Sequence, residues 1–285
     1  MSNVRTALAG GLHWRVTSSG VGPVVLFLHG TGAATHSWHD LLPIAAQHFQ
    51  TVAVDLPGHG ETRGRLSGGL TMPGVARALA ALLETIDVRP DLIVGHSAGA
   101  AIALRMVLDG LAVPKGVVAI APALLPFPGI AQALFPAMAK LLFVNPLAPH
   151  LFAQVARRPG AVGSFLIRST GSHLDAAGVA AYARYFSNAR HCAGALGMMA
   201  DWDLVPLKRD LPLLKLPVLV LHGDRDAAIP VSAAREAVAL MPAATVEIVS
   251  RAGHLLHEEH PVATAERILR FARNCGIEVR NEEPA

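Results

Sequence analysis

Hydrophobic positions along the chain follow two kinds of pattern. Short runs rich in Val, Ile and Leu predict strands, and longer segments with apolar residues three to four positions apart predict helices. The predicted strands are residues 12–17, 24–29, 51–55, 92–95, 117–121, 218–222 and 245–249, and the predicted helices are residues 36–48, 71–87, 98–109, 231–240 and 261–274. Runs such as 24–28 are apolar at every position, so we expect helices on both faces. This alternation is typical of an α/β fold with a mostly parallel, doubly wound sheet.

Residues 122–208 interrupt the alternation. They contain no clear strand and are rich in Ala, Leu, Pro and Met, so we interpret them as a helical cap. The α/β core is then made of residues 1–121 and 209–285. Between Lys115 and Arg157 the only formal charge is Lys140. Large apolar side chains occupy the same stretch, namely Phe127, Phe135, Met138, Phe143 and Phe152. We expect them to pack the cap against the sheet and, as a group, to form an apolar pocket wall or docking patch.

The composition raises the question of a membrane span. Hydrophobic residues make up 52% of the 285 residues, charged residues make up 16%, and the mean hydropathy is +0.42, which excludes a disordered chain. Residues 116–139 carry no charge, but they contain Pro122, Pro126, Pro128 and Pro136. Closely spaced prolines would break the hydrogen bonding of a lipid-exposed helix. We therefore exclude a transmembrane helix and leave a peripheral membrane contact open.

Charge and cysteine content narrow the protein class further. The net charge is +3, but the basic residues are scattered and form no stripe, which argues against nucleic-acid binding. Cys192 and Cys275 match no metal or redox spacing, so we predict free thiols. The first twenty residues lack the basic and apolar regions of a signal peptide, which favours the cytoplasm.

A candidate nucleophile lies between a predicted strand and a predicted helix. The segment Gly95-His96-Ser97-Ala98-Gly99 follows the strand at 92–94 directly. A sharp strand-to-helix turn with small neighbours lifts a serine hydroxyl out at the carboxyl end of a sheet. The segment therefore predicts Ser97 as a nucleophile; the alternative is an ordinary glycine-rich loop.

A serine nucleophile needs a base and a carboxylate that orients the base. In the order Ser, Asp, His, the loop after the strand at 218–222 offers Asp224 and Asp226, and the loop after the last strand offers His254. We favour Asp226 because it has the G-x-x-D spacing of this hydrolase pattern. The predicted catalytic residues are therefore Ser97, Asp226 and His254.

Four polar residues follow His254 and allow another interpretation. His257, Glu258, Glu259 and His260 could suggest a metal cluster, but their spacing is not H-E-x-x-H and a further ligand is not obvious. We interpret them as a solvated helix start.

Acyl transfer also needs N–H donors directed at the developing oxyanion. The expected donors are the backbone N–H of Ala98 and that of Thr31, in the turn at 29–32, with Gly32 in reserve. The alternative is a plain flexible turn.

Several segments together resemble the α/β-hydrolase superfamily. They are His29-Gly30-Thr31-Gly32, Asp55-Leu56-Pro57-Gly58-His59-Gly60, Gly95-His96-Ser97-Ala98-Gly99, Gly223-Asp224-Arg225-Asp226 and Gly253-His254. Within the superfamily the chain resembles the magnesium-chelatase-associated accessory hydrolases of bacteriochlorophyll biosynthesis. The segments behind this are 30–38, 95–101 with 105–106 and 108–110, 125–127, 170–172 and 198–204. This resemblance implies a role near magnesium insertion into protoporphyrin, with a contact to the chelatase, and defines no hydrolytic substrate.

The sequence thus predicts a serine hydrolase that acts on an ester-like bond of a hydrophobic small molecule, with a tetrapyrrole as one candidate. No organic cofactor and no metal is required. Haloalkane and epoxide hydrolases are set aside because they use an aspartate where Ser97 stands. Two alternatives stay open: a carbon–carbon bond hydrolase, and a non-catalytic protein that binds a porphyrin or docks on the chelatase.

Overall fold

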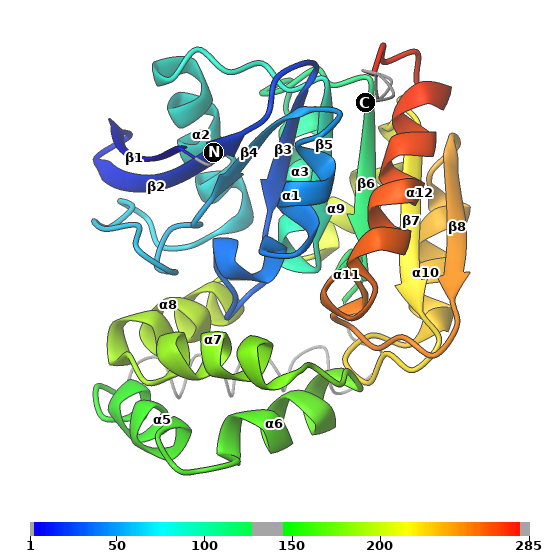
Figure 1. Ribbon diagram of the computed structural model, residues 1–285. Coiled ribbons are helices and arrows are strands. Elements are labelled where there is room, and N and C mark those ends of the chain that lie inside the picture. Colours follow the sequence, from blue (N-terminus) through cyan, green and yellow to red (C-terminus); the bar gives the residue numbers. More distant parts are fainter. Residues whose placement is uncertain (1–2, 127–144, 280–285) are drawn as a thin grey trace.

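An eight-stranded sheet forms the centre of the computed structural model, which describes residues 3–126 and 145–279 (Figure 1). The strand order is β1-β2-β4-β3-β5-β6-β7-β8. The strands are β1 (Asn3–Ala9), β2 (Leu12–Ser19), β3 (Val24–Leu28), β4 (Gln50–Val54), β5 (Leu92–His96), β6 (Gly116–Ile120), β7 (Val218–Gly223) and β8 (Ala244–Val249). The pairs β1–β2 and β2–β4 are antiparallel, and the other neighbours are parallel. The predicted α/β fold with a mostly parallel sheet is confirmed.

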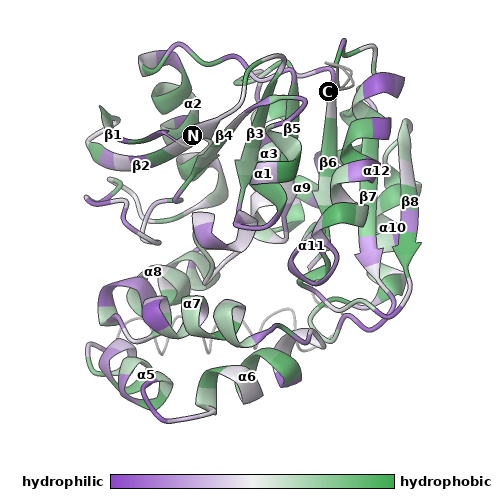
Figure 2. Ribbon diagram, in the orientation of Figure 1, coloured by the Kyte–Doolittle hydropathy of each residue, from purple (hydrophilic) through white to green (hydrophobic). Residues whose placement is uncertain are grey.

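Helices cover both faces of this sheet, and the central strands supply side chains to both. On β3, Leu26 and Leu28 belong to the core with α2 (Met72–Thr85), α3 (Ala98–Leu108) and α10 (Val231–Leu240). Val25 and Phe27 belong to the opposite core with α1 (Leu41–Ala45) and α12 (Pro261–Asn274). Burial on both faces explains why the central strands are hydrophobic along their whole length (Figure 2).

Two local predictions differ from the structure. The helix predicted at 36–48 is a 3-10 helix at Thr35–Trp38 followed by the short α1. Pro43 has no N–H to donate to residue 39 and its ring crowds that carbonyl, so one continuous helix is disfavoured. The strand β1 was not predicted, because most of its side chains are exposed and its sequence shows no apolar alternation.

A layer of helices lies below the carboxyl ends of the parallel strands in Figure 1. It consists of α5 (Ala148–Ala156), α6 (Ala161–Thr170), α7 (Ala176–Phe186) and α8 (Ala189–Ala200), and α9 (Val205–Asp210) leads back to the sheet. We call α5–α8 the cap helices. A hydrophobic cluster joins them to the core: Val162, Leu166 and Tyr182 pack with Ala33 and Leu255. The cap therefore rests on the loops that carry the candidate site.

Part of the expected apolar cap lies outside the described residues. This applies to Phe127, Phe135, Met138 and Phe143, whereas Phe152 on α5 is 46% exposed. None of the helices within residues 3–126 and 145–279 is long and apolar enough to cross a membrane.

Both cysteines are free thiols, as predicted. Cys192 is buried in α8, and Cys275 is half-buried directly after α12. Burial raises the pKa of the Cys192 thiol to about 11, which keeps it protonated and unreactive at neutral pH.

Candidate active site

Ser97 occupies a sharp turn between β5 and α3. Its backbone has φ 49° and ψ −110°, a region that side-chain-bearing residues rarely adopt. Its N–H donates to the carbonyl of Ile120 on the neighbouring strand β6, at 2.9 Å. This hydrogen bond holds the strained turn to the sheet. Ser97 is half-buried and lies at the carboxyl end of β5, on the side of the sheet where the cap helices lie (Figure 1).

The turn at Ser97 is possible because its neighbours are glycines. A Cβ on Gly99 would overlap the carbonyl oxygen of Leu28, and a Cβ on Gly95 would collide with the backbone of Ala100. A Cβ on Gly30 would approach the Cβ of Ser97 to 3.1 Å. The glycine-rich turn after β3 therefore packs directly against the serine turn.

Asp226 and His254 come from the loops after β7 and β8. The Nδ1 atom of His254 lies 2.8 Å from Oδ2 of Asp226, and the Asp226 side chain is fully buried. Oδ1 of Asp226 accepts hydrogen bonds from the N–H groups of Ala228 and Ile229, both at 2.8 Å. The carboxylate favours the tautomer with the proton on Nδ1, which leaves Nε2 of His254 able to accept another proton.

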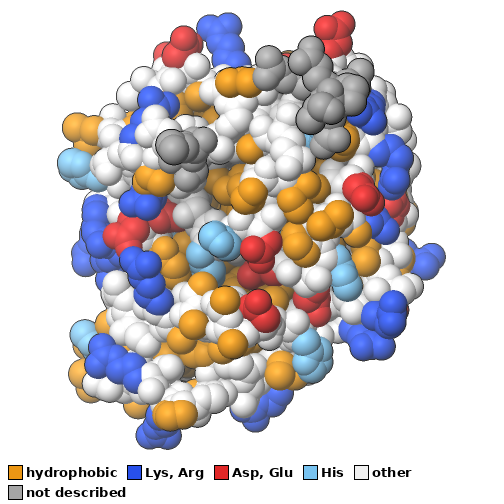
Figure 3. Space-filling view, in the orientation of Figure 1, with side chains coloured by type: hydrophobic (Ala, Val, Ile, Leu, Met, Phe, Trp, Pro, Cys, Tyr) orange, Lys and Arg blue, Asp and Glu red, His pale blue; other side chains and the backbone are white. Residues whose placement is uncertain are grey.

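His96 connects the serine turn to the His254 loop. Its Nε2 atom donates to the carbonyl oxygen of His254 at 3.1 Å, and the two rings lie with their centroids 4.8 Å apart. The structure thus brings the residue before Ser97 into contact with His254. In the space-filling view, histidine and acidic side chains lie beside hydrophobic ones where the cap meets the core (Figure 3).

The two predicted oxyanion donors are backbone groups next to this turn. Ala98 is the first residue of α3, so its N–H has no acceptor within the helix. Thr31 directly follows Gly30, which packs on Ser97, and its hydroxyl donates to Sδ of Met198 in α8 at 3.3 Å. The cap therefore holds the Thr31 side chain. The backbone N–H of Thr31, which is the expected oxyanion donor, takes no part in that contact.

Buried histidines surround the site. Except for His222, their rings contact one another or the aromatic side chains Trp38, Tyr182, Tyr185 and Phe186. Burial lowers the pKa of each of them, namely His29, His36, His59, His96, His191, His222 and His257. The pKa falls to about 3 for His36 and about 4 for His191. These rings are therefore neutral at pH 7, so the buried side chains around the candidate site include no charged histidine ring among them.

Several of these histidines hold loops in place. His191 of α8 accepts from the N–H of Gly60 at Nδ1 and donates from Nε2 to the carbonyl of Gly32. His29 accepts from the N–H of Leu56 and donates to the carbonyl of Gly30. The cap is thereby tied to the turn after β3 and to the loop after β4.

The solvated helix start predicted after His254 is wrong. His257, in α11 (Leu256–Glu259), is 1% exposed, and the Glu258 side chain is 10% exposed. Burial raises the pKa of Glu258 to about 8, although the Tyr182 hydroxyl donates to its Oε1 at 2.7 Å. The cap covers this segment, which no local pattern could reveal. Within the described parts of the chain, no group of three or more His, Cys, Asp or Glu side chains is arranged to hold a metal ion.

The sequence missed one neighbour of Asp226. His222 is fully buried at the end of β7, with Nε2 donating to the carbonyl of Ile229 at 3.0 Å and lying 3.5 Å from Oδ2 of Asp226. The only sequence feature that could have indicated His222 as a neighbour of Asp226 is its position directly before the G-x-x-D segment at 223–226. By contrast, Asp224 is exposed.

A serine at the turn after β5 and an Asp–His pair in the loops after β7 and β8 are an arrangement typical of α/β hydrolases. The chain belongs to the alpha/beta hydrolase family, whose model matches residues 25–267. It is 38% identical over 251 residues to the magnesium-chelatase 30 kDa subunit of Rhodobacter capsulatus, covering 87% of each chain. The resemblance noted in the sequence is therefore confirmed.

More distant proteins share the fold. The chain is 27% identical over 268 residues to a pimeloyl-(acyl-carrier protein) methyl ester esterase of Vibrio vulnificus (strain CMCP6), covering 92% of this chain and 98% of the esterase. A solved serine hydrolase involved in carbazole degradation superimposes with a TM-score of 0.78 at 21% identity. That match covers 96% of this chain and 100% of the other, and shows the common fold.

Proposed function

We propose that the protein is a serine hydrolase that cleaves an ester-like bond in a hydrophobic small molecule. The main observation is the hydrogen bond between His254 and Asp226 beside the turn that presents Ser97. A neutral imidazole held by a buried carboxylate is the base that a serine nucleophile requires. Family membership supports a hydrolase.

The proposed reaction has two halves. Ser97 Oγ attacks the carbonyl carbon, and Nε2 of His254 takes the hydroxyl proton while Asp226 stabilises the imidazolium. The N–H groups of Thr31 and Ala98 donate to the oxyanion. The C–O bond to the leaving alcohol then breaks, and the alcohol takes the proton from His254. Water, deprotonated by His254, attacks the acyl-enzyme and releases the acid and free Ser97.

The surroundings of Ser97 support a hydrophobic substrate. The side chains packed around the candidate site include neutral histidines, Tyr185 and Phe186, and the Phe186 ring would lie 3.5 Å from a Cβ on Gly32. Met198 adds a soft apolar surface at Thr31. Uncharged aromatic surroundings favour an apolar ligand, because a charged group buried among them would lose its hydration without gaining an ion-pair partner.

Covalent labelling tests this proposal. The wild-type protein is incubated with a fluorophosphonate probe, with Ser97→Ala as the matched variant and a known serine hydrolase as the reagent control. We expect labelling of the wild type and loss of labelling in Ser97→Ala. A folded wild-type protein that stays unlabelled while the reagent control reacts would overturn the proposal.

We place this hydrolase in bacteriochlorophyll biosynthesis, as an accessory to magnesium insertion that works in the cytoplasm. The support is the relative named magnesium-chelatase 30 kDa subunit. A tetrapyrrole ester is then a candidate substrate. Deleting the gene should lower bacteriochlorophyll and accumulate the intermediate before magnesium insertion, measured by chromatography of pigment extracts. Unchanged pigments in the deletion strain would contradict this placement.

A docking role on the chelatase is the second candidate. The relative is named as a subunit, and apolar side chains spaced four residues apart are exposed at the start of α5 and along it: Leu147, directly before the helix, is 71% exposed, Leu151 66% and Val155 39%. Complementation of a deletion strain separates the two roles. Full rescue by Ser97→Ala would favour docking, whereas rescue by Leu151→Asp together with failure of Ser97→Ala would favour hydrolysis.

A further inference from the structure

The cap contributes directly to the backbone geometry of the His254 loop. Thr170, the last residue of α6, accepts a hydrogen bond at its carbonyl oxygen from the N–H of His254 at 2.8 Å. The same oxygen accepts from the N–H of Ala227, next to Asp226, at 3.3 Å. One carbonyl of the cap thus contacts both loops that carry the Asp–His pair.

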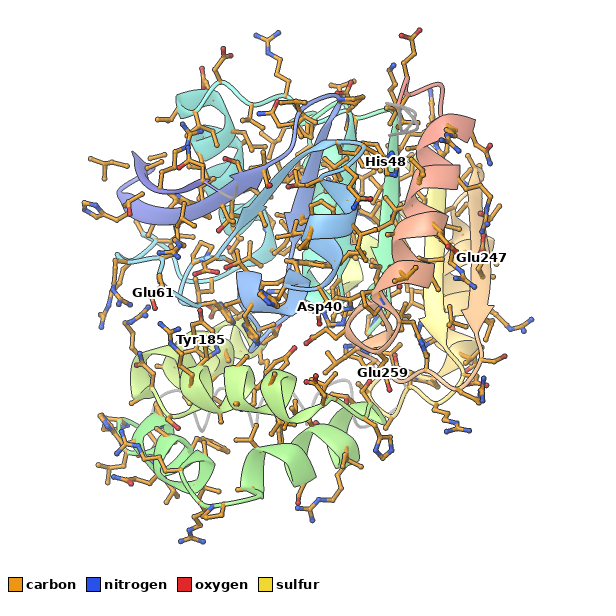
Figure 4. All side chains as sticks on the ribbon, viewed as in Figure 1. Asp40, His48, Glu61, Tyr185, Glu247 and Glu259 are labelled. Atoms are coloured by element: carbon orange, nitrogen blue, oxygen red, sulfur yellow. The ribbon has the colours of Figure 1, made fainter. Side chains whose placement is uncertain are left out.

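Ser172 and Glu259 complete this contact. The Ser172 hydroxyl accepts from the N–H of Leu255 at 2.8 Å and donates to Oε2 of Glu259 at 2.9 Å. Oε2 of Glu259 also accepts from the N–H of Gly253 at 2.7 Å, and Oε1 accepts from the N–H of His173 at 3.0 Å. Figure 4 shows Glu259 at the junction of α11 with the cap.

The backbone next to the imidazole is therefore held by hydrogen bonds at four of its polar groups. The three consecutive N–H groups of Gly253, His254 and Leu255 bind Glu259, Thr170 and Ser172 respectively. The carbonyl of His254 accepts from His96. With its main chain fixed on both sides, His254 has little freedom except rotation of its side chain, which Asp226 restricts.

The cap and the two loops are closely packed where they meet. A Cβ on Gly253 would overlap the Ser172 hydroxyl, and a Cβ on Gly171 would overlap the carbonyl of Arg225. Ser172 itself is fully buried. Residues 170–172 of the cap therefore lie in backbone contact with the loops that carry Asp226 and His254. A shift of residues 170–172 would move the His254 loop with them.

We propose that Glu259 and Ser172 are positioning residues that set the place of His254 through its main chain, and that the cap is thereby part of the catalytic geometry. Neither side chain bonds to the imidazole, so their effect is carried by the backbone N–H groups of Gly253 and Leu255, which flank His254. This inference rests on the proposed serine hydrolase for its effect on rate, but the clamp itself is a property of the fold.

Two substitutions test the clamp. Glu259→Gln removes one of the acceptor oxygens, and Ser172→Ala removes the hydroxyl. The matched controls are Glu247→Gln and Thr51→Val. The first changes a carboxylate of β8 that pairs with Arg267 and Arg270 of α12 (Figure 4), and the second removes a buried hydroxyl that donates to the carbonyl of Ser19. Both controls lie outside the candidate site.

Three measurements are made on each full-length variant: the fluorophosphonate labelling rate, kcat and KM for p-nitrophenyl butyrate, and amide hydrogen exchange at residues 253–255. For Glu259→Gln and Ser172→Ala we expect labelling rate and kcat to fall about 10- to 100-fold, because small displacements of a catalytic group cost that much. KM should change far less, and exchange at 253–255 should accelerate. The Nδ1 proton resonance of His254 should shift, and the controls should match the wild type.

The outcomes separate the clamp from the proposed activity. The positioning role would be overturned if the wild-type protein reacts with the probe and both Glu259→Gln and Ser172→Ala keep the wild-type kcat. A fall in melting temperature in Thr51→Val without loss of kcat would show that lost stability alone does not slow the reaction. If the wild type does not react at all, the hydrolase proposal fails, and unchanged exchange at 253–255 in Glu259→Gln would separately overturn the clamp.

Discussion

His254 Nδ1 lies 2.8 Å from Asp226 Oδ2, although the two residues are 28 positions apart in different loops. The loops after β7 and β8 reach the same sheet edge because neighbouring parallel strands end on the same side. Burial of the Asp226 side chain and two N–H bonds to its other oxygen fix the carboxylate in place.

Asp226→Asn should abolish most of the proposed esterase activity, and Asp224→Asn should not. The asparagine would favour the wrong imidazole tautomer, so we expect kcat to fall about 1,000- to 10,000-fold. Asp224 is exposed and only two positions away, which makes it a matched control. Hydrolysis of p-nitrophenyl butyrate measures both. Equal losses in the two variants would contradict the assignment of Asp226.

Glycine substitutions in the cap should have opposite effects on stability. Gly163 lies in α6, and a Cβ there would make ordinary contact with Val179 at 3.6 Å, so Gly163→Ala should stabilise by about 0.5–1 kcal/mol. A Cβ on Gly194 would overlap the carbonyl of Gly58, so Gly194→Ala should destabilise by about 1–3 kcal/mol. Thermal melts of both variants check this; a lower melting temperature for Gly163→Ala would refute the packing described.

Stability should fall as the pH drops below about 6.5. Burial lowers the pKa of His257 from 6.5 to about 3. As the pH falls, the unfolded chain therefore binds a proton at this residue before the folded protein does, and this lowers the free energy of the unfolded state relative to the folded state. The contribution is fully present above pH 6.5 and lost as the pH falls toward 3. Each such histidine changes the free energy of unfolding by at most about 1.4 kcal/mol per pH unit.

Replacing His257 tests the source of this acid sensitivity. Neither of its ring nitrogens has a hydrogen-bond partner among the described residues, so His257→Phe loses no hydrogen bond. Urea unfolding between pH 4 and 7 should show a shallower pH dependence for His257→Phe than for the wild type. The exposed His150 provides the control, His150→Phe. An unchanged slope in His257→Phe would exclude this residue as a source.

Glu258 should produce the opposite pH dependence. Burial raises its pKa from 4.5 to about 8, so the folded state retains a proton that the unfolded chain has lost. Its effect is absent below pH 4.5, and it destabilises increasingly from there to pH 8. Glu258→Gln, which cannot ionise, should therefore gain stability over the wild type as the pH rises through this range. The exposed Glu266→Gln should show no such gain in the same unfolding series.

The sequence by itself determined the parts of the protein that depend on local pattern. Two-sided apolar runs gave the central strands, and Gly95 and Gly99 around Ser97 indicated a strand-to-helix turn because only small residues fit there. The order of Ser97, Asp226 and His254 at strand ends could also be predicted, since parallel strands bring their carboxyl ends to one edge. The exposed β1 could not, because a strand without apolar alternation leaves no signal.

Only the tertiary structure decided what surrounds those residues. His257 and Glu258 are polar and follow a loop, so their sequence suggests solvent, yet the docked cap buries them. The bond between Ser172 and Glu259 joins positions 87 residues apart. Such contacts depend on how the cap rests on the sheet, and that is set by the packing of many side chains at once, which no local spacing of residues encodes.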